Sequence, residues 1–294
     1  MPLKFKNAEI QERDIQIFKF ILSCRGCTAS QINYKFFKAY NTCAIRLLKL
    51  SRFVYLNKER ETLTAEYVYT LTPEAMKLLK DKGLYTGQRF KPPRLSLSGK
   101  YHDLDVVDLR LVIENDSRLK ISEWISDYEL ASELNKQIQN RSRTNNRRVA
   151  DGWFLVVNES FRRPFILEYI RQDYFKERYY KVLSNIEYMY PFESVLVVCS
   201  TKAKMVKYYN WLQDRSRNRF PGKYAFTFKA SILGTKTLFE ADIMKGDGNK
   251  PGFRHRWEPM YDPKNKKLEL FEGNLNLQAQ GIDVIKANKE SENF

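Results

Sequence analysis

The stretch RRVADGWFLVVNESFRRPFILEYIR, residues 147–171, decides the fold of this chain. It holds two apolar runs, VADGWFLVV and PFILEYIR, separated by a polar turn, and this pattern predicts two neighbouring strands. Asp151 opens the first strand and Glu168 lies inside the second. A carboxylate in a buried strand costs several kcal/mol unless it is paired, hydrogen-bonded or bound to a metal. We therefore expect a specific partner for each of these two side chains.

Further helical and strand patterns follow on both sides of this stretch. From residue 101 the predicted order is helix, strand, short helix, strand, strand, helix, strand, helix and strand, the last strand being residues 223–233. Such an order indicates an α/β (α+β) domain over residues 101–273, with a central mixed sheet covered by helices. Within it, residues 244–259 read as a loop and residues 266–273 as one more strand. Residues 274–294 have no apolar periodicity and predict a polar tail.

The first 85 residues predict a different unit. Residues 12–25 have helical spacing, Thr28 is a good N-cap for a second helix, and residues 42–56 contain a third. An alternating segment with a charged tip then predicts a hairpin. Pro73 begins a final helix, which Gly83 closes. Three helices, a hairpin and a closing helix are typical of a winged helix-turn-helix.

The third helix has two predicted faces. The inward face is expected to carry four apolar side chains: Ala44, Leu47, Leu48 and Leu50. The opposite face is expected to carry four polar or cationic ones: Thr42, Arg46, Lys49 and Arg52. Lys58 and Arg60 lie near the hairpin tip. Cationic and polar side chains on such a helix suit the groove of double-stranded DNA, and an adaptor role between proteins stays open.

The charge of the chain points to a polyanionic partner. The 294 residues include 51 basic and 35 acidic ones, a net charge of +16, and residues 1–98 hold 18 basic against 8 acidic residues. Residues 86–100 read as a basic linker rich in proline and serine. Residues 136–148 form a second basic tract directly before Asp151, and it contains Arg141, Arg143, Arg147 and Arg148. This tract is expected to hold a DNA backbone or, alternatively, to be a solvated insertion.

Composition also bears on the compartment. No apolar run approaches the roughly 20 residues that a membrane helix needs, and the first residues are too polar for a signal peptide. The four cysteines Cys24, Cys27, Cys43 and Cys199 agree with a reducing compartment. We therefore expect a cytoplasmic protein with no membrane partner. Cys24 and Cys27 lack the second cysteine pair of a zinc site, and the cysteines are expected to be ordinary core residues.

The order of elements, with acids on two adjacent strands, resembles the restriction-endonuclease-like PD-(D/E)xK fold. This resemblance implies that Asp151 and Glu168 bind Mg²⁺ or Mn²⁺, with Glu133 or Glu123 as a further ligand. It also implies a lysine two residues after the strand glutamate, where this chain has Ile170. A cation from the following helix, Lys176 or Arg178, is the alternative catalytic group. Since Ala150 also replaces the proline of the motif, the departures favour a site that has lost its chemistry.

Several segments in series resemble the replication-relaxation protein family of plasmids and mobile elements. They are LTPEAMKLL at 71–79, HDLDVVDLRL at 102–111, the Trp124 strand, ADGWFLV at 150–156, FILEYIR at 165–171 and SVLVVCST at 194–201. The resemblance covers roughly residues 12–215. It implies a role in plasmid replication or in DNA relaxation and mobilisation, with replication or relaxosome proteins as partners.

The favoured hypothesis is a site-specific DNA-binding protein with a degenerate nuclease-like domain. One alternative is an active Mg²⁺-dependent endonuclease or nickase that uses Asp151 and Glu168. Another is a transcriptional repressor whose second domain dimerises, and a homodimer stays open in each case. His102 and His255 are the only histidines, which argues against a histidine metal cluster, and His102 is expected to cap its own helix.

Overall fold

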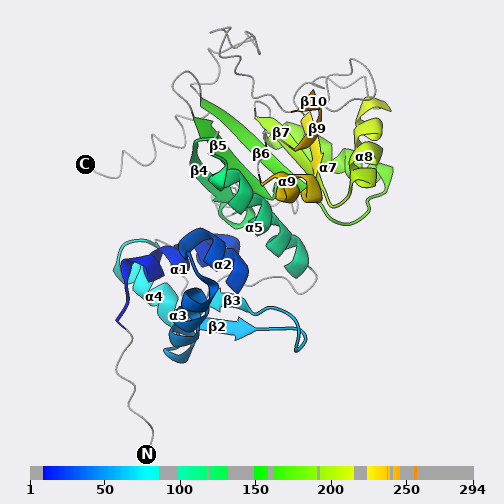
Figure 1. Cartoon of the computed structure of the whole chain (residues 1–294). Coiled ribbons are helices and arrows are strands. Elements are labelled where there is room, and N and C mark those ends of the chain that lie inside the picture. Colours follow the sequence, from blue (N-terminus) through cyan, green and yellow to red (C-terminus); the bar gives the residue numbers. More distant parts are fainter. Residues whose placement is uncertain are drawn as a thin grey trace, which may run out of the picture.

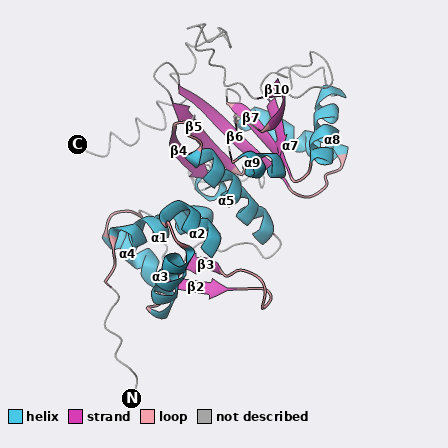
Figure 2. Cartoon of the chain, viewed as in Figure 1, coloured by secondary structure: helices cyan, strands magenta, loops and turns pink. Residues whose placement is uncertain are grey.

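The structure of the protein is a computed structural model of the whole chain. It describes residues 9–85, 99–117, 119–131, 149–157, 162–190, 193–214, 224–236, 238, 241–245 and 255–256. Helices and strands are both present and form an α+β protein with a mixed sheet (Figure 1, Figure 2). The predicted Glu133, the four arginines of the 136–148 tract, the last predicted strand and the polar tail lie outside the described residues.

The N-terminal unit, residues 9–85, contains four helices and three strands among its described residues. They are α1 (Glu12–Cys24), β1 (Cys27–Thr28), α2 (Ala29–Phe36), α3 (Tyr40–Arg52), β2 (Leu56–Glu59), β3 (Val68–Leu71) and α4 (Pro73–Asp81). The strands pair antiparallel in the order β1-β3-β2. Two threonine side chains cap helices as expected. The Thr28 hydroxyl accepts a hydrogen bond from the backbone N–H of Gln31 at 3.2 Å, and the Thr72 hydroxyl accepts one from the backbone N–H of Ala75 at 3.3 Å. The predicted three helices, hairpin and closing helix occur in this order, and the two-residue strand β1 was not predicted.

The sheet unit begins with α5 and follows the predicted order closely. Its elements are α5 (Lys100–Asn115), β4 (Ile121–Ser126), β5 (Gly152–Val157), β6 (Arg162–Ile170), α7 (Lys176–Met189), β7 (Ser194–Cys199), α8 (Lys202–Asp214), β8 (Tyr224–Phe228), α9 (Lys229–Thr235), β9 (Asp242–Lys245) and β10 (His255–Arg256). The strand order is β10-β9-β8-β7-β6-β5-β4. Strands β6, β7 and β8 run parallel to one another, whereas the other pairs are antiparallel, so the sheet is mixed as predicted.

Two predictions near the end of the sheet are wrong. The strand expected over residues 223–233 ends at Phe228, and Lys229 begins α9, whose Ile232 packs into the core. A short apolar run does not by itself distinguish a strand from a buried helix. The loop expected over residues 244–259 contains the end of β9 and the whole of β10, which pair antiparallel. Such short strands have too few residues to show a period in the sequence.

Helices cover both faces of the sheet and sort its side chains into two cores. Helices α5 and α9 pack on one face, together with Leu167 and Tyr169 of β6. Helices α7 and α8 pack on the other face, together with Ile166 and Ile170. Alternation along β6 explains the division, because successive side chains of a strand point to opposite faces. Glu168 therefore points to the α7 and α8 face.

Helix α5 belongs to both units. Its Val107 and Leu111 are buried in the core of the N-terminal unit, whereas Leu109, Val112 and Ile113 are buried against the sheet. Figure 1 shows α5 between the two units. Gln31 of α2 adds polar contacts to α5, because its amide donates to the carbonyl of Leu104 at 2.9 Å and to Asp108 at 2.7 Å. The apolar and polar contacts together fix α2 against α5.

Candidate functional site

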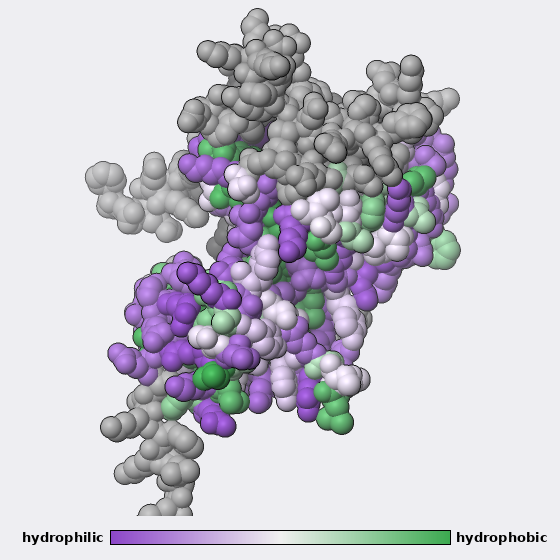
Figure 3. All heavy atoms as spheres, in the orientation of Figure 1, coloured by the Kyte–Doolittle hydropathy of each residue, from purple (hydrophilic) through white to green (hydrophobic). Residues whose placement is uncertain are grey.

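Helix α3 presents one face to solvent, and we call it the α3 face. Its members are Thr42, Ile45, Lys49 and Arg52, all exposed, while Cys43, Leu47 and Leu50 point into the core. Lys49 and Arg52 lie in the last turn, where the helix dipole favours positive charge. The α3 face therefore combines two unburied cations with a hydroxyl and an apolar side chain. The visible surface of the N-terminal unit is mostly hydrophilic with small hydrophobic patches (Figure 3).

Arg46 does not belong to the α3 face, which corrects the prediction. Its Nε donates to Asp14 Oδ1 at 2.9 Å, and its Nη2 donates to Asp14 Oδ2 and to the carbonyl of Glu9, the latter at 2.8 Å. Asp14 is fully buried, and the Arg46 side chain is only 14% exposed. A buried carboxylate is costly unless it is paired or hydrogen-bonded, and here the Arg46 guanidinium contacts both oxygens while the Gln11 N–H donates to Oδ2 at 2.8 Å. Arg46 is thus part of the structure of the N-terminal unit.

One apolar side chain of α3 also differs from expectation. Leu48, predicted to point inward, is 36% exposed; Ile45, for which no face was predicted, is 60% exposed. The buried positions are Cys43, Leu47 and Leu50, so the prediction is right for Leu47 and Leu50, and Cys43 is buried in addition. Exposed apolar groups beside Lys49 therefore form part of the same surface.

The hairpin of β2 and β3 carries the two predicted cations. Lys58 Nζ and the Arg60 guanidinium lie 5.0 and 4.9 Å from the centre of the Tyr67 ring, which orients both side chains by cation–π contact. Arg60 also donates to the carbonyl of Leu63 at 3.1 Å. Both cations remain exposed. The hairpin therefore holds two positive charges on one aromatic support.

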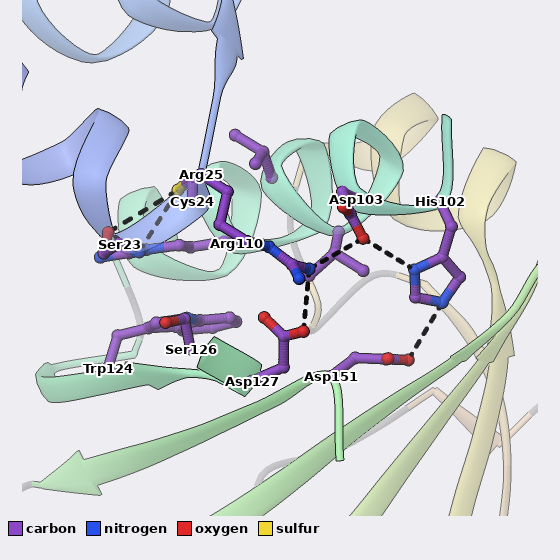
Figure 4. Close-up of a pocket in the computed structure, with 12 residues that line it drawn as sticks. Ser23, Cys24, Arg25, His102, Asp103, Arg110, Trp124, Ser126, Asp127 and Asp151 are labelled. Carbon is purple, nitrogen blue, oxygen red and sulfur yellow. Dashed lines mark hydrogen bonds and ion pairs between the residues drawn. The ribbon is translucent and has the colours of Figure 1, made fainter. Parts of the chain in front are cut away.

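Asp151 lies directly before β5, beside the C-terminal half of β6, where its backbone N–H donates to the carbonyl of Leu167 at 3.0 Å. One of its carboxylate oxygens accepts a hydrogen bond from the backbone N–H of Tyr169 at 2.6 Å. The same oxygen lies 3.3 Å from His102 Nε2, and that nitrogen is 3.1 Å from the Tyr169 carbonyl oxygen. Figure 4 shows the carboxylate and the imidazole facing each other across the pocket. Tyr169 pairs with Val198 of β7 on one side, and on the β5 side, where strand pairing ends at Leu167, the side chains of Asp151 and His102 contact its backbone instead.

The surroundings of His102 favour its protonated form. Burial opposes its protonation, but the charge of Asp151 and the hydrogen bonds with Asp103, Asp151 and the Tyr169 carbonyl outweigh burial and raise the pKa of His102 to about 11. His102 lies in the first turn of α5, and its ring contacts β6. The prediction that it caps its own helix is therefore wrong, because Gly99 occupies the N-cap position.

Arg25 enters the same pocket from the N-terminal unit. It is the C-cap of α1, in the left-handed conformation with φ 64°. Its Nη2 lies 3.0 Å from Asp103 Oδ1 and 2.8 Å from Asp127 Oδ2. We call the pocket lined by Arg25, His102, Asp103, Asp127 and Asp151 the junction pocket, because α1, α5 and the sheet meet there.

The junction pocket holds three carboxylates and three cationic side chains, because Arg110 of α5 also lines it. Burial raises the pKa of Asp127 to about 6; Arg25 opposes this rise, while Asp151 and Asp103 add to it. Asp103 Oδ2 is buried and has no hydrogen-bond partner among the described residues. Nevertheless, each of the three carboxylates contacts Arg25 or His102. Within the described part of the chain, no group of three histidine, cysteine, aspartate or glutamate side chains has an arrangement that could hold a metal ion.

The predicted catalytic residues do not come together among the described residues. Glu168 is 1% exposed and does not line the junction pocket, because it points to the sheet face covered by α7 and α8. Lys176 pairs with Asp214 of α8 at 2.9 Å. Ile170, at the position of the expected lysine, is fully buried in the core. Asp151 is the one predicted catalytic residue that lines the pocket.

A second polar cluster lies on the α5 face near the pocket. Lys229 Nζ lies 2.5 Å from Asp105 and 2.9 Å from Asp108, and the Tyr169 hydroxyl donates to Asp105 at 2.7 Å. Arg171 Nε is 3.4 Å from the same Asp105. Sequence patterns did not indicate this cluster, since its members are separated by as many as 124 residues. Its groups pair with one another across α5, β6 and α9.

We compared the chain with known proteins and found no relative. No family model, no curated protein and no solved structure matches the chain. Among the described residues, no helix has the length and apolar character required to cross a bilayer.

Proposed function

We propose that this protein binds double-stranded DNA at specific sites, and that the N-terminal unit is a winged helix whose α3 enters the major groove. The α3 face carries the proposal. Thr42, Lys49 and Arg52 are exposed along one helix, and Lys58 and Arg60 extend from the adjacent hairpin. Cations and hydroxyls in this arrangement suit base edges and phosphates. The excess of basic residues in the first third of the chain adds the attraction that phosphates require.

The sheet unit is proposed to be a nuclease-like scaffold without catalysis. Its order of one helix, three antiparallel strands, one helix and a parallel strand supports a restriction-endonuclease-like fold. The contacts of Asp151 support a loss of catalysis. Its carboxylate lies 3.3 Å from His102 Nε2 and accepts a hydrogen bond from the backbone N–H of Tyr169. Both contacts are made to Oδ2, and a metal ion at the other oxygen would lie close to His102, whose protonated form would repel it. The sheet unit then acts as a second contact surface for DNA or protein.

The proposed setting is a plasmid or other mobile element, in replication or in DNA relaxation and mobilisation. This part rests on the resemblance to the replication-relaxation family. The same proposal places the protein in the cytoplasm, where it has access to DNA. It also names replication or relaxosome proteins as partners. Footprinting along the source element tests it: protection at a replication or transfer origin supports the proposal, and protection confined to one promoter would favour a repressor.

DNA binding itself is tested by selection from a random duplex library, followed by fluorescence anisotropy. We expect one enriched sequence motif and a loss of at least roughly tenfold in affinity in the double variant Lys49→Ala with Arg52→Ala. The control is Lys181→Ala with Lys202→Ala, exposed cations on α7 and α8, which removes the same charge. Equal losses in the two variants would show that only net charge matters and would overturn the proposal.

The nuclease alternative has its own test. Supercoiled plasmid is incubated with the full chain and Mg²⁺ or Mn²⁺, and nicking is followed on a gel. We expect no cleavage of plasmid that carries the selected motif. Cleavage that disappears in Asp151→Asn would replace the proposal with an endonuclease or nickase.

A further inference from the structure

Cys24 and Cys27 differ from the other two cysteines in their surroundings. Cys24 ends α1, Cys27 begins β1, and the left-handed Arg25 reverses the chain between them. Their side chains lie close enough for each sulfur to shift the pKa of the other. Cys43 is fully buried in the same core as the pair, where its thiol donates to the carbonyl of Ala29 at 3.7 Å, and Cys199 is fully buried in the core beneath α7 and α8. The pair is therefore a dithiol held by a tight turn.

Polar groups from both units surround Cys24. Arg110 of α5 donates from Nη1 to Cys24 Sγ at 3.5 Å and to the Ser23 hydroxyl at 2.7 Å. The Ser23 hydroxyl itself lies 3.8 Å from Cys24 Sγ. Arg110 is held in place by Glu114 at 2.8 Å. A cation directed at a sulfur favours the thiolate, which is the nucleophilic form of cysteine.

Cys24 also has a route to solvent. It lines the junction pocket together with Ser23, Arg25 and Arg110, and 8% of its surface is exposed. Cys27 is fully buried behind it. A small oxidant that enters the pocket therefore meets Cys24 first and Cys27 second, which is the order of an attacking and a resolving cysteine.

We propose that Cys24 and Cys27 form a reactive dithiol at the junction of the two units, which a peroxide converts into an intramolecular disulfide. The Cys24 thiolate attacks one peroxide oxygen, the O–O bond breaks, and the leaving oxygen takes up a proton. Cys24 becomes a sulfenic acid. The Cys27 sulfur then attacks the Cys24 sulfur, forming the S–S bond and releasing water with the proton of Cys27. Two thiols are oxidised, and the peroxide is reduced.

The acidities of Cys24, Cys43 and Cys199 agree with Cys24 as the attacking thiolate. Burial disfavours the Cys24 thiolate, but the hydrogen bond from Cys27 and the charge of Arg110 outweigh burial and lower the pKa of Cys24 to about 7. Burial raises the pKa of Cys43 to about 11 and that of Cys199 to about 12. Close to neutral pH, Cys24 is the cysteine with a substantial thiolate fraction among these three, and the other two serve as internal controls.

Oxidation has a structural consequence at the junction. The disulfide removes the negative charge that Arg110 contacts on α1, so one polar link between the N-terminal unit and α5 is lost. Arg110 keeps its contact with Glu114, which lies on α5 itself. The dithiol is therefore placed to change how firmly the N-terminal unit is held on α5.

The test uses the full chain with hydrogen peroxide close to neutral pH, followed by denaturing trypsin digestion and mass spectrometry. Trypsin cleaves after Arg25, so a disulfide links peptide 20–25 to peptide 26–35. We expect this linked pair, its loss on reduction, and unmodified Cys43 and Cys199. Alkylation of the reduced native protein at pH 7 is expected to be roughly a hundredfold faster at Cys24 than at Cys43 or Cys199.

Variants separate the two roles. Cys27→Ser should stop at a sulfenic acid that dimedone captures on Cys24, and Cys24→Ser should leave Cys27 unmodified. Arg110→Gln should move the pH profile of Cys24 alkylation to higher pH, a change that loosened packing alone would not produce. Equal slow alkylation of Cys24, Cys43 and Cys199 in the wild-type chain would overturn the proposal, even if the variants fail to fold.

Discussion

The α3 face and the junction pocket use charged side chains in opposite ways. On the α3 face, Lys49 and Arg52 are exposed. In the junction pocket, Arg25 and His102 are partly buried and satisfy carboxylates of the same chain. Charges that are free can bind a partner, whereas charges that are already paired hold the fold together. From this comparison we expect the α3 face to bind a partner and Asp151 to stabilise the fold.

Arg46 sharpens the comparison, because it lies on α3 and yet is paired. Arg46→Ala would leave the fully buried Asp14 without its cation, and we expect a loss of about 3–5 kcal/mol in the free energy of unfolding. Urea unfolding followed by circular dichroism measures this loss. Lys49→Ala is the matched control and should change stability by less than about 0.5 kcal/mol. If the Arg46→Ala variant were as stable as the wild type but bound DNA more weakly, Arg46 would belong to the binding surface.

Asp151 tests the structural side of the comparison. Asp151→Ala would leave the Tyr169 N–H without its acceptor, and the expected loss is about 1–3 kcal/mol in the free energy of unfolding. Asp151→Asn keeps an acceptor oxygen and should cost less. Thermal unfolding of both variants distinguishes them. Unchanged stability in Asp151→Ala would mean that the carboxylate is retained for another purpose.

The pH dependence of stability probes the His102–Asp151 pair. The pKa of His102 is raised in the folded protein to about 11, above its unfolded value near 6.5. Such a group contributes its full stability below the unfolded pKa and loses it as the pH rises through the folded pKa. Between about pH 7 and pH 10, the wild type should therefore lose stability more steeply than His102→Gln. Parallel curves for the two proteins would contradict an ion pair.

The hairpin cations should have the smallest effect. Lys58→Ala is expected to weaken DNA binding only a few-fold and to lower the slope of log affinity against log salt by about 1, as for one lost phosphate contact. Anisotropy titrations at several salt concentrations measure the slope. Lys202→Ala on α8 is the control and should leave the slope unchanged.

Local sequence patterns predicted the order of helices and strands well. The apolar runs of β5, β6 and β7 have the length and composition of buried strands. Thr28 and Pro73 mark the starts of helices, Thr28 as an N-cap and Pro73 as a first helical residue. These features depend on residues close together in the chain. They could therefore be found without a structure.

The sites depended on pairings that no local pattern contains. Periodicity assigned Arg46 to the same exposed face as Lys49. The sequence of residues 40–52 does not reveal that Arg46 pairs with Asp14, which lies on another helix. The contact of Arg25 with Asp127 spans 102 residues and was missed for the same reason. Glu168 and Asp151 were expected to share a site because they lie on adjacent strands. The bend at Asp151 directs its carboxylate to α5, away from the face that Glu168 occupies.

The central claim is that the α3 face binds DNA and the junction pocket does not. Its most direct test is an anisotropy titration of one labelled, selected duplex with the wild type, Lys49→Ala with Arg52→Ala, and Asp151→Asn. We predict that the double variant loses at least roughly tenfold in affinity while Asp151→Asn binds like the wild type. Loss of binding in Asp151→Asn, with normal binding in the folded double variant, would contradict the claim.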